Sequence, residues 1–336
     1  MKQNLSNIIL SRTDSIGDMV LALPMAKVLK DHFPGIKIFF LGREYTRPVV
    51  DACVYADGFI ELNDFLNNNI LTGGEKSQAI VHVKPLATAA KRAKQMHIQW
   101  RIGTTNRIYH WNTCNKLVKL SRKKSNLHEA QLNLKLLQAL EIKKDFSLAE
   151  ISESYGLEKL QPLKEEFASL IDTSKYNLIL HPKSRGSARE WGLKNFTSLI
   201  RLLDKDRYKI FISGTDAEKK LVQPLLDEVP HLVTDISGKM ELGQFMSFIS
   251  KCNGLVACST GPLHIAAALG IDALGIYSPL HSIRPERWGP VGKKTEVFVL
   301  NKTCTDCYKN KMQCHCVTEI DPLLIKKSLD KKSSRA

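Results

Sequence analysis

Short runs of apolar residues alternate along the chain with longer stretches in which apolar residues recur at helical spacing. In the first half, this pattern predicts strands at 7–11, 36–41, 59–62, 79–83 and 98–102, and helices at 18–32, 43–56, 85–96 and 128–140. Continuous apolar runs are typical of strands that are covered on both faces, and amphipathic stretches are typical of the covering helices. The first half is therefore predicted to form a parallel sheet between layers of helices.

The alternation stops over the polar stretch 145–174, which we interpret as a linker and a short preliminary helix, and then begins again. Strands are predicted at 176–181, 209–213, 254–258 and 273–277, and helices at 193–203, 216–226, 242–250 and 261–269. A length of 336 residues suits two domains. We therefore predict two doubly wound α/β domains, 1–150 and 151–330, followed by a disordered tail at 331–336.

The loop at 12–18 is the first candidate site, because ligands of doubly wound sheets bind outside the carboxyl ends of the strands. It lacks the glycine pattern of a dinucleotide fingerprint. Gly17 suits a tight turn or the close approach of a ligand. Asp14 and Asp18 both fit the first turn of the following helix, where the free amides stabilise a carboxylate. From the residues alone, capping is the favoured role for both.

The loop at 181–192 is the second candidate site. It carries the cations Lys183, Arg185 and Arg189 directly before a predicted helix. Lysine and arginine side chains make charge-assisted hydrogen bonds to phosphate oxygens. The loop is therefore predicted to bind a diphosphate, with a mobile polar surface loop as the alternative.

The third candidate site is the loop at 258–264. Ser259, Thr260 and Gly261 stand at the start of an apolar predicted helix. Hydroxyl groups and free backbone amides at a helix start form a site for an anion. The alternative is an ordinary serine or threonine cap, and His264 taken alone is more often a packed residue than a catalyst.

The charge of the chain is strongly positive and unevenly distributed. Lys and Arg total 49 against 34 Asp and Glu, for a net charge of +15, and 76–128 contains twelve basic residues and no acidic one. Such a stretch attracts an anionic partner, which could be a nucleic acid, an anionic membrane surface or a phosphorylated glycolipid. The alternative is a solvated basic face. No targeting segment or apolar run long enough to span a bilayer is found, so a cytoplasmic protein is expected.

Four of the eight cysteines cluster near the end of the chain, at Cys304, Cys307, Cys314 and Cys316. Four thiols can bind structural zinc, but this spacing differs from the usual pairs of zinc ligands. Packed or redox-labile thiols are the favoured interpretation. The sequence leaves open whether these cysteines bind metal or form disulfides.

Five motifs in register resemble those of family 9 glycosyltransferases, which include the heptosyltransferases of lipopolysaccharide core assembly. They are Ser11 to Val20 followed by Pro24, Arg101-Ile102-Gly103, His181-Pro182, Ser213-Gly214, and Ser259 to Ala268. The resemblance covers nearly the whole chain. It implies a GT-B fold, in which two Rossmann-like domains face each other across a cleft. The first domain would bind the acceptor and the second the nucleotide sugar.

The resemblance also implies an inverting transfer that needs no metal and no cofactor. Asp18 would be the catalytic base, because the acceptor hydroxyl must lose its proton as the new bond forms. Cations and amides would stabilise the departing diphosphate. The residues implied for the donor diphosphate are Lys183, Arg185, Arg189, Ser259, Thr260, Gly261 and His264, and those implied for the acceptor side are Arg12, Ser15, Gly17 and Arg101.

Two positions depart from the family pattern. Arg189 stands where the family has a lysine, and Ser259 stands where characterised heptosyltransferases have an aspartate that orients the donor sugar. The expected donor is ADP-heptose, with another donor sugar, an inactive relative, or a protein that binds anionic glycans or nucleic acid as alternatives. The acceptor sugar and the oligomeric state stay open.

The expected partners are a nucleotide-sugar donor and an anionic glycolipid acceptor at the inner face of the bacterial inner membrane. The basic stretch lacks a nucleic-acid motif, so no nucleic-acid partner is expected. No amphipathic anchor is evident in the sequence. Transient contact with the membrane is therefore expected to be electrostatic and weakened by salt.

Overall fold

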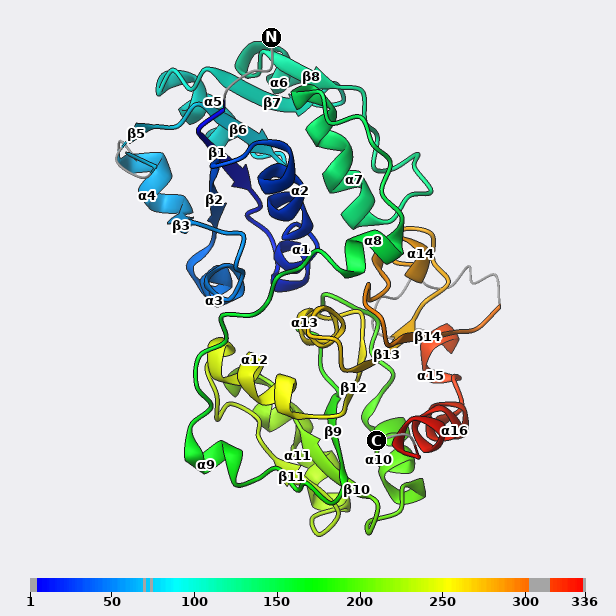
Figure 1. Ribbon diagram of the computed structural model, residues 1–336. Helices are drawn as coiled ribbons and strands as arrows, with labels where there is room; N and C mark the ends of the chain where they lie inside the picture. The colour runs from blue at the N-terminus through cyan, green and yellow to red at the C-terminus, as the bar shows by residue number, and fades with distance from the viewer. Residues whose placement is uncertain (1–4, 69–70, 73–74, 302–314, 335–336) are drawn as a thin grey trace. The chain divides into compact units, whose positions relative to one another are not determined.

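The computed structural model describes residues 5–68, 71–72, 75–301 and 315–334. The chain divides into two compact units, Met1–Lys159 and Leu160–Ala336 (Figure 1). We call them the amino-terminal and carboxyl-terminal units. The division falls a little later than the boundary predicted at 150/151, because the polar stretch after α8 (Leu148–Ser152) still belongs to the first unit. There, Cys53 pairs with Leu157 in an isolated bridge.

The amino-terminal unit contains a six-stranded sheet in the order β3-β2-β1-β6-β7-β8, with every neighbouring pair parallel. This is the doubly wound order, in which the connections change direction between β1 and β6. The strands are β1 (Asn7–Ser11), β2 (Lys37–Gly42), β3 (Gly58–Glu61), β6 (Ala79–His82), β7 (Trp100–Thr104) and β8 (Lys116–Val118). β8 and the small pair β4 (Leu71–Thr72) and β5 (Glu75–Lys76) were not predicted.

Helices cover both faces of this sheet. Ile9 and Ile80 pack against Phe65 of α4 and against α5 in one buried cluster. Because side chains alternate along a strand, the buried Ile8 and Leu10 face the opposite side. The helices are α1 (Ile16–Val20), α2 (Pro24–His32), α3 (Arg47–Asp51), α4 (Leu62–Asn67), α5 (Ala87–Gln95), α6 (Ile108–Thr113), α7 (Glu129–Lys135) and α8, with the 3-10 helices η1 (Glu44–Thr46) and η2 (Leu136–Leu140).

The prediction of one continuous helix at 18–32 is wrong. The structure divides it into α1 and α2, and α2 has Pro24 as its first residue. Proline has no backbone N–H and crowds the preceding turn, so it is accepted at a helix start and disrupts a helix interior. The break at Leu21–Leu23 follows from this residue.

The carboxyl-terminal unit repeats the same architecture. Its sheet has the order β11-β10-β9-β12-β13-β14, again with parallel neighbours, so the connections change direction between β9 and β12. The strands are β9 (Tyr176–His181), β10 (Tyr208–Ile212), β11 (Thr234–Asp235), β12 (Gly254–Cys258), β13 (Asp272–Tyr277) and β14 (Thr295–Val299).

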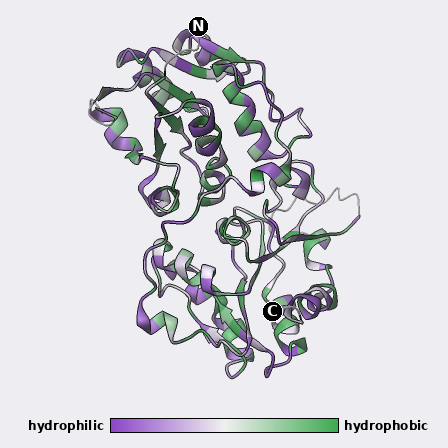
Figure 2. Cartoon of the chain, viewed as in Figure 1, coloured by the Kyte–Doolittle hydropathy of each residue, from purple (hydrophilic) through white to green (hydrophobic). Residues whose placement is uncertain are grey.

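The helices of this unit also form two layers. α10, α11 and α16 contribute to the buried cluster on one face, and α12 packs on the other, where Phe248 contacts Phe211 with ring centroids 5.0 Å apart. Figure 2 shows hydrophobic residues concentrated on the strands of both sheets. The helices are α9 (Glu165–Ala168), α10 (Leu193–Leu202), α11 (Lys219–Glu228), α12 (Leu242–Lys251), α13 (Gly261–Ala268), α14 (Pro285–Trp288), α15 (His315–Thr318) and α16 (Pro322–Ser333), with the 3-10 helix η3 (Asp216–Glu218).

The disordered tail predicted at 331–336 is wrong for its first residues, because α16 continues to Ser333. Side chains at the start of β10 hold the end of this helix. The Arg207 guanidinium donates to the Asp330 carbonyl at 2.8 Å, and the Tyr208 hydroxyl lies 2.7 Å from the Ser333 hydroxyl. These long-range bonds outweigh the polar composition of the segment.

Candidate active site

The candidate loops lie at the carboxyl edges of the two sheets, where the direction of the connections changes. The loop at 12–18 follows β1, and the loop at 181–192 follows β9. The loop at 258–264 follows β12, which pairs directly with β9. Two of the three predicted loops therefore share one edge of the carboxyl-terminal sheet, in the position where doubly wound sheets bind ligands.

Arg12 organises the site of the amino-terminal unit. It is only 2% exposed and directly follows β1. Its guanidinium contacts three carboxylates: Nε lies 2.8 Å from Asp14, Nη1 lies 3.1 Å from Glu129, and Nη2 forms an ion pair with Asp18. A buried cation of this kind is stable only when such partners surround it.

The charges in this cluster shift each other's pKa. Burial alone would lower the pKa of Arg12, but Asp18, Asp14 and Glu129 together raise it above its ordinary value. Burial raises the pKa of Asp14, and the negative charge of Asp18 adds to this effect. Arg12 and Lys84, whose ammonium lies 3.3 Å from Asp14, oppose it. The cluster is thus a coupled set of charges, with Arg12 at its centre.

Both carboxylate oxygens of Asp18 accept hydrogen bonds. One carboxylate oxygen accepts from Arg12, and the other accepts from the Ser15 hydroxyl at 2.6 Å. Ser15 is the N-cap residue of α1, and its hydroxyl accepts from the Asp18 backbone amide at 3.4 Å. The structure therefore gives the cap to Ser15, where the sequence favoured Asp14 or Asp18. Gly17 is buried within α1, and Asp18 is 14% exposed, so its carboxylate is held in place but reaches solvent.

The residues that surround Arg12 from later parts of the chain were not predicted. Glu129, on α7, is 1% exposed and also contacts Arg122 at 3.0 Å. Arg122 donates to Asn133 at 3.1 Å and to the Val83 carbonyl at 2.8 Å. Arg122 was counted among cations available to an anionic partner, but its guanidinium is bound within the protein. Glu129 lies far from Arg12 in sequence, and no local motif marked it.

Arg101 is not brought to the Arg12 cluster. It lies in β7 in register with Ile80 of β6, before the end of the strand. Its guanidinium donates to the carbonyl of Thr113 at 2.7 Å and to that of Ile98. Ile98 precedes β7 and Thr113 precedes β8, so this side chain extends toward the amino ends of the strands. In this structure Arg101 supports the backbone, away from the predicted acceptor side.

In the loop after β9, Lys183 is already paired. Its ammonium forms an ion pair with Glu190, and the same carboxylate accepts from the backbone amide and the hydroxyl of Ser184, both at 3.0 Å. The backbone then passes through two residues with positive φ, Arg185 at 49° and Gly186 at 77°. Arg185 is exposed on this tight turn. Glu190, which the sequence did not single out, neutralises part of the positive charge of the loop.

Arg189 is positioned by Trp191, which lies two residues later in the chain. Trp191 is completely buried, donates its indole N–H to the Ile320 carbonyl at 2.9 Å, and contacts Phe196 edge to face. Gly192 then takes a φ of 93° at the start of α10, a conformation that favours glycine. The half-buried Arg189 therefore stands on a rigid support at the carboxyl edge of the sheet.

His181 ends β9 and is 7% exposed. Burial lowers its pKa to about 4, although Glu218 and Glu190 favour its charged form. Its Nδ1 lies 2.9 Å from the Ser213 hydroxyl. At neutral pH the ring is uncharged, so it links the two loops and adds no charge for a diphosphate.

The loop after β12 leads into α13. Thr260 is the N-cap residue by position, but its hydroxyl makes no capping hydrogen bond. Gly261 and Pro262 form the first turn, where the lack of a proline N–H costs nothing. Thr260 is 5% exposed and His264 is 4% exposed, while Ser259 is half-buried. An ordinary side-chain cap is thus not formed, and the start of α13 keeps the character of an anion site.

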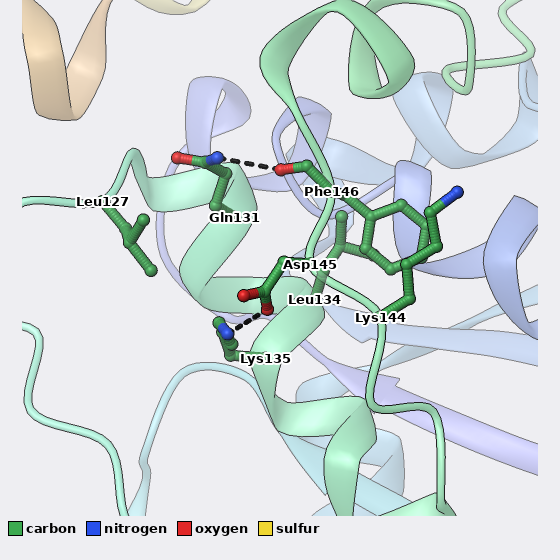
Figure 3. A pocket seen from close by; sticks show the side chains of 7 residues that line it. All are labelled: Leu127, Gln131, Leu134, Lys135, Lys144, Asp145 and Phe146. Carbon is green, nitrogen blue, oxygen red and sulfur yellow. Dashed lines mark hydrogen bonds and ion pairs between the residues drawn. The ribbon is translucent and has the colours of Figure 1, made fainter.

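A small hollow beside α7 does not belong to the predicted site (Figure 3). Its volume of ≈ 60 Å³ is far below the roughly 300 Å³ at which ligand pockets begin. Across it, Lys135 forms an ion pair with Asp145, and the Gln131 amide donates to the Phe146 carbonyl at 2.8 Å. The residues that line it are Leu127, Gln131, Leu134, Lys135, Lys144, Asp145 and Phe146.

Within the described ranges, no group of three or more His, Cys, Asp or Glu side chains is arranged to hold a metal ion. Cys304, Cys307 and Cys314 lie outside those ranges, and Cys316 is buried in the core of the carboxyl-terminal unit. In the part of the chain that the structure describes, no helix has both the length and the apolarity needed to cross a membrane.

Two doubly wound units with polar loops at their switch points are the architecture expected of a GT-B glycosyltransferase, and comparison with known proteins agrees. The family model described as "Glycosyltransferase family 9 (heptosyltransferase)" matches residues 79–318. The chain therefore belongs to glycosyltransferase family 9, and it is a glycosyltransferase. The family resemblance drawn from the five sequence motifs is thereby confirmed.

Known relatives of similar sequence support this assignment. The chain is 25% identical over 303 residues to a putative glycosyltransferase of Haemophilus influenzae, covering 85% of this chain and 86% of that protein. It is 24% identical over 161 residues to the lipopolysaccharide core heptosyltransferase OpsX of the same organism, covering 45% of this chain and 46% of that protein.

The fold is similar to a family 9 glycosyltransferase from Veillonella parvula, with a TM-score of 0.79, 16% identity and coverage of 100% of this chain and 99% of that one. It is also similar to the ADP-heptose lipopolysaccharide heptosyltransferase II of Escherichia coli, with a TM-score of 0.75, 16% identity and coverage of 98% and 99%. The predicted GT-B class is confirmed by these likenesses together with the two parallel sheets.

Proposed function

We propose that this chain transfers a heptose from ADP-heptose to the anionic core of a lipopolysaccharide or lipooligosaccharide, or to a related surface glycan. The observation that carries the proposal is the Asp18 carboxylate. It is held by Arg12 and Ser15 at the switch point of a family 9 chain. Relatives described as lipopolysaccharide and lipooligosaccharide heptosyltransferases support the donor and acceptor classes.

In the proposed reaction Asp18 is the general base. Its carboxylate takes the proton of the acceptor hydroxyl while the oxygen attacks the anomeric carbon of the donor. The bond from that carbon to the diphosphate oxygen breaks, and its electron pair leaves with the diphosphate. Attack opposite the leaving group inverts the anomeric configuration. Arg12 and Ser15 fix the orientation of the carboxylate, so little further entropy is lost in orienting it when the acceptor binds.

The proposed diphosphate site lies on the carboxyl-terminal unit. Arg185 and Arg189 supply positive charge, and the amides at the start of α13, at Gly261, supply oriented donors. Lys183 contributes only if the phosphate competes with Glu190, to which its ammonium is paired. Thr260 and His264 flank the same turn. These groups replace a metal ion in stabilising the leaving group, so we propose that no metal or cofactor is required.

Ser259 favours a second candidate within the same family, a transferase with a different donor sugar. Its side chain is shorter than the aspartate expected at this position from the family resemblance. A serine presents no negative charge to donor hydroxyls. A donor whose hydroxyls are recognised elsewhere would bind here equally well.

We also propose that the enzyme acts in the cytoplasm at the inner face of the inner membrane, where a lipid-linked anionic acceptor is presented. The basic stretch at 76–128 supports this, because its exposed cations attract an anionic surface. Arg122 is excluded from that role by its contact with Glu129.

The Asp18→Asn variant tests the mechanism. Asparagine keeps the size of the side chain but cannot take a proton, so turnover is expected to fall by about 10²–10⁴-fold, with nucleotide-sugar affinity unchanged. Asp31→Asn is the matched control. Asp31 is an exposed aspartate of the same unit, and its carboxylate forms an ion pair with Lys27 on the surface of α2. Turnover should be measured with the donor in excess and affinity by calorimetry. Wild-type turnover in Asp18→Asn would remove Asp18 as the base.

A further inference from the structure

We propose that helix α6 docks the amino-terminal unit on an anionic lipid bilayer, with Ile108 and Trp111 entering the interfacial region of the lipid. This inference rests on the proposed function, since it specifies where the enzyme meets the membrane that carries its acceptor. It replaces the purely electrostatic contact expected from the sequence with a surface that also has apolar anchors. We call Arg107, Ile108, Trp111 and Lys94 the α6 surface.

The apolar part of this surface is unusually exposed. Ile108 is 88% exposed and Trp111 is 64% exposed, the two highest values among the large hydrophobic side chains that the structure describes. Residues three apart on a helix share a face, so both side chains extend from the same side of α6. The opposite side is anchored, because His110 is fully buried.

Trp111 has the arrangement of an interfacial residue. Its indole N–H donates to the Thr105 carbonyl at 3.0 Å, so its polar atom is satisfied within the protein. The ring can then leave water without losing a hydrogen bond. Tryptophan is enriched at membrane interfaces because of this combination of a large apolar ring and one polar group.

Cations flank the two apolar side chains. Arg107 is exposed and directly precedes Ile108, and the Lys94 ammonium donates to the Asn112 carbonyl at 2.8 Å, beside the end of α6. The whole segment from 76 to 128 has no acidic residue. Apolar anchors bordered by lysine and arginine are typical of proteins that lie on anionic bilayers. Two side chains are too small a patch for a stable protein partner, which needs about 800 Å² on each side.

The position of α6 relates the proposed docking to the chemistry of the same unit. α6 begins shortly after β7 ends at Thr104, and β7, β6 and β1 are parallel neighbours. Its first residues therefore lie at the same edge of the sheet as the loop with Asp18. In addition, His110 stacks on His82 with ring centroids 5.7 Å apart, and His82 is in register with Ser11, directly before Arg12. Docking through α6 would bring a lipid-linked acceptor to this edge.

Vesicle co-sedimentation of the full chain tests the inference. Vesicles of phosphatidylcholine with phosphatidylglycerol should bind the wild-type protein, and the double variant Ile108→Ser and Trp111→Ser should bind at least about tenfold more weakly, since two apolar anchors are lost. Leu221→Ser is the matched control, because Leu221 is 54% exposed but lies on α11 of the other unit. Equal binding by the wild type and the double variant, or no binding by the wild type, would overturn the inference.

Two readouts separate this inference from the proposed function. Transfer to a deacylated, water-soluble acceptor should be the same in the wild type and the double variant, while transfer to an acceptor in vesicles should fall only in the double variant. If both proteins transfer equally to acceptor in vesicles, the α6 surface is not the docking surface and the enzymatic proposal stands. If neither transfers to the soluble acceptor while the wild type still binds vesicles through α6, the enzymatic proposal fails and the docking surface stands.

Discussion

Replacing Arg12 with methionine should destabilise the amino-terminal unit by about 3–5 kcal/mol, the usual cost of removing one partner from a buried ion pair. Methionine has a similar length, so the main loss is the charge. Arg12 is 2% exposed and contacts Asp14, Asp18 and Glu129, which all remain after the substitution. The free energy of unfolding should therefore fall because buried carboxylates lose their cation.

The three carboxylates do not lose the same amount of electrostatic stabilisation when Arg12 is replaced. Glu129 keeps Arg122 at 3.0 Å, and Asp14 keeps Lys84 at 3.3 Å, although Lys84 is 49% exposed and its attraction is screened by water. Asp18 keeps its hydrogen bond from the Ser15 hydroxyl. The double variant Arg12→Met with Asp18→Asn should therefore recover part of the lost stability, as expected for residues in direct contact.

The effect should depend on pH in a defined direction. Carboxylates that are buried without a cation have a pKa above that of the unfolded chain, as Asp14 already does through burial. The folded variant then binds more protons than the unfolded one, so its stability falls as pH rises through this range. The deficit relative to the wild type should be largest at neutral pH and should shrink toward pH 4.

Hydrogen exchange followed by mass spectrometry suits this test, because it reports each unit separately. Peptides from β1 and α7 should lose protection in Arg12→Met, and peptides from β9 serve as an internal control. A loss below about 1 kcal/mol at neutral pH, the range of a surface ion pair, would refute the central role of Arg12. Equal losses in β1 and β9 peptides would do so as well.

Three further predictions concern the carboxyl-terminal unit. Arg189→Ala should weaken nucleotide diphosphate binding by roughly 1.5–3 kcal/mol in calorimetry, and an unchanged affinity would shift this role to Arg185. Glu190→Gln should tighten binding of the same diphosphate, because it releases the Lys183 ammonium from its ion pair; weaker binding would show that Glu190 supports the site. Thermal stability should fall as pH drops from about 6.5 toward 4, because burial lowers the pKa of His181 to about 4 and the unfolded chain then binds more protons. A His181→Asn variant should show a shallower acid slope, and an identical slope would exclude His181 as a contributor.

The architecture could be predicted because it depends on a repeated pattern. Strands such as β9 and β12 are short continuous buried runs, and their length and apolar composition identify them. The short elements could not be predicted in this way. β8 has three residues and α6 has six, which is less than two turns, so tertiary contacts decide their conformation. For α6 those contacts include the buried His110 against His82.

The candidate site was predictable only in part, for a similar reason. Loops that follow strands can be located from the pattern, and the three predicted loops do lie at the carboxyl edges of the sheets. The charge balance within them depends on long-range contacts. Glu129 reaches Arg12 from α7, and Glu190 neutralises Lys183 across its own loop, and neither pairing has a local signature. Arg101 matched a family motif, yet its guanidinium holds backbone carbonyls.

The most direct test of the proposed function is a calorimetric binding series with ADP, GDP, UDP and their sugar conjugates, in the presence of a metal chelator. The proposal predicts selective binding of ADP and ADP-heptose without metal, and loss of part of this affinity in Arg189→Ala. Selective binding of another sugar nucleotide would keep the mechanism and contradict the proposed donor. Absence of binding by every compound in the series would contradict the assignment of a nucleotide-sugar site to the loops after β9 and β12.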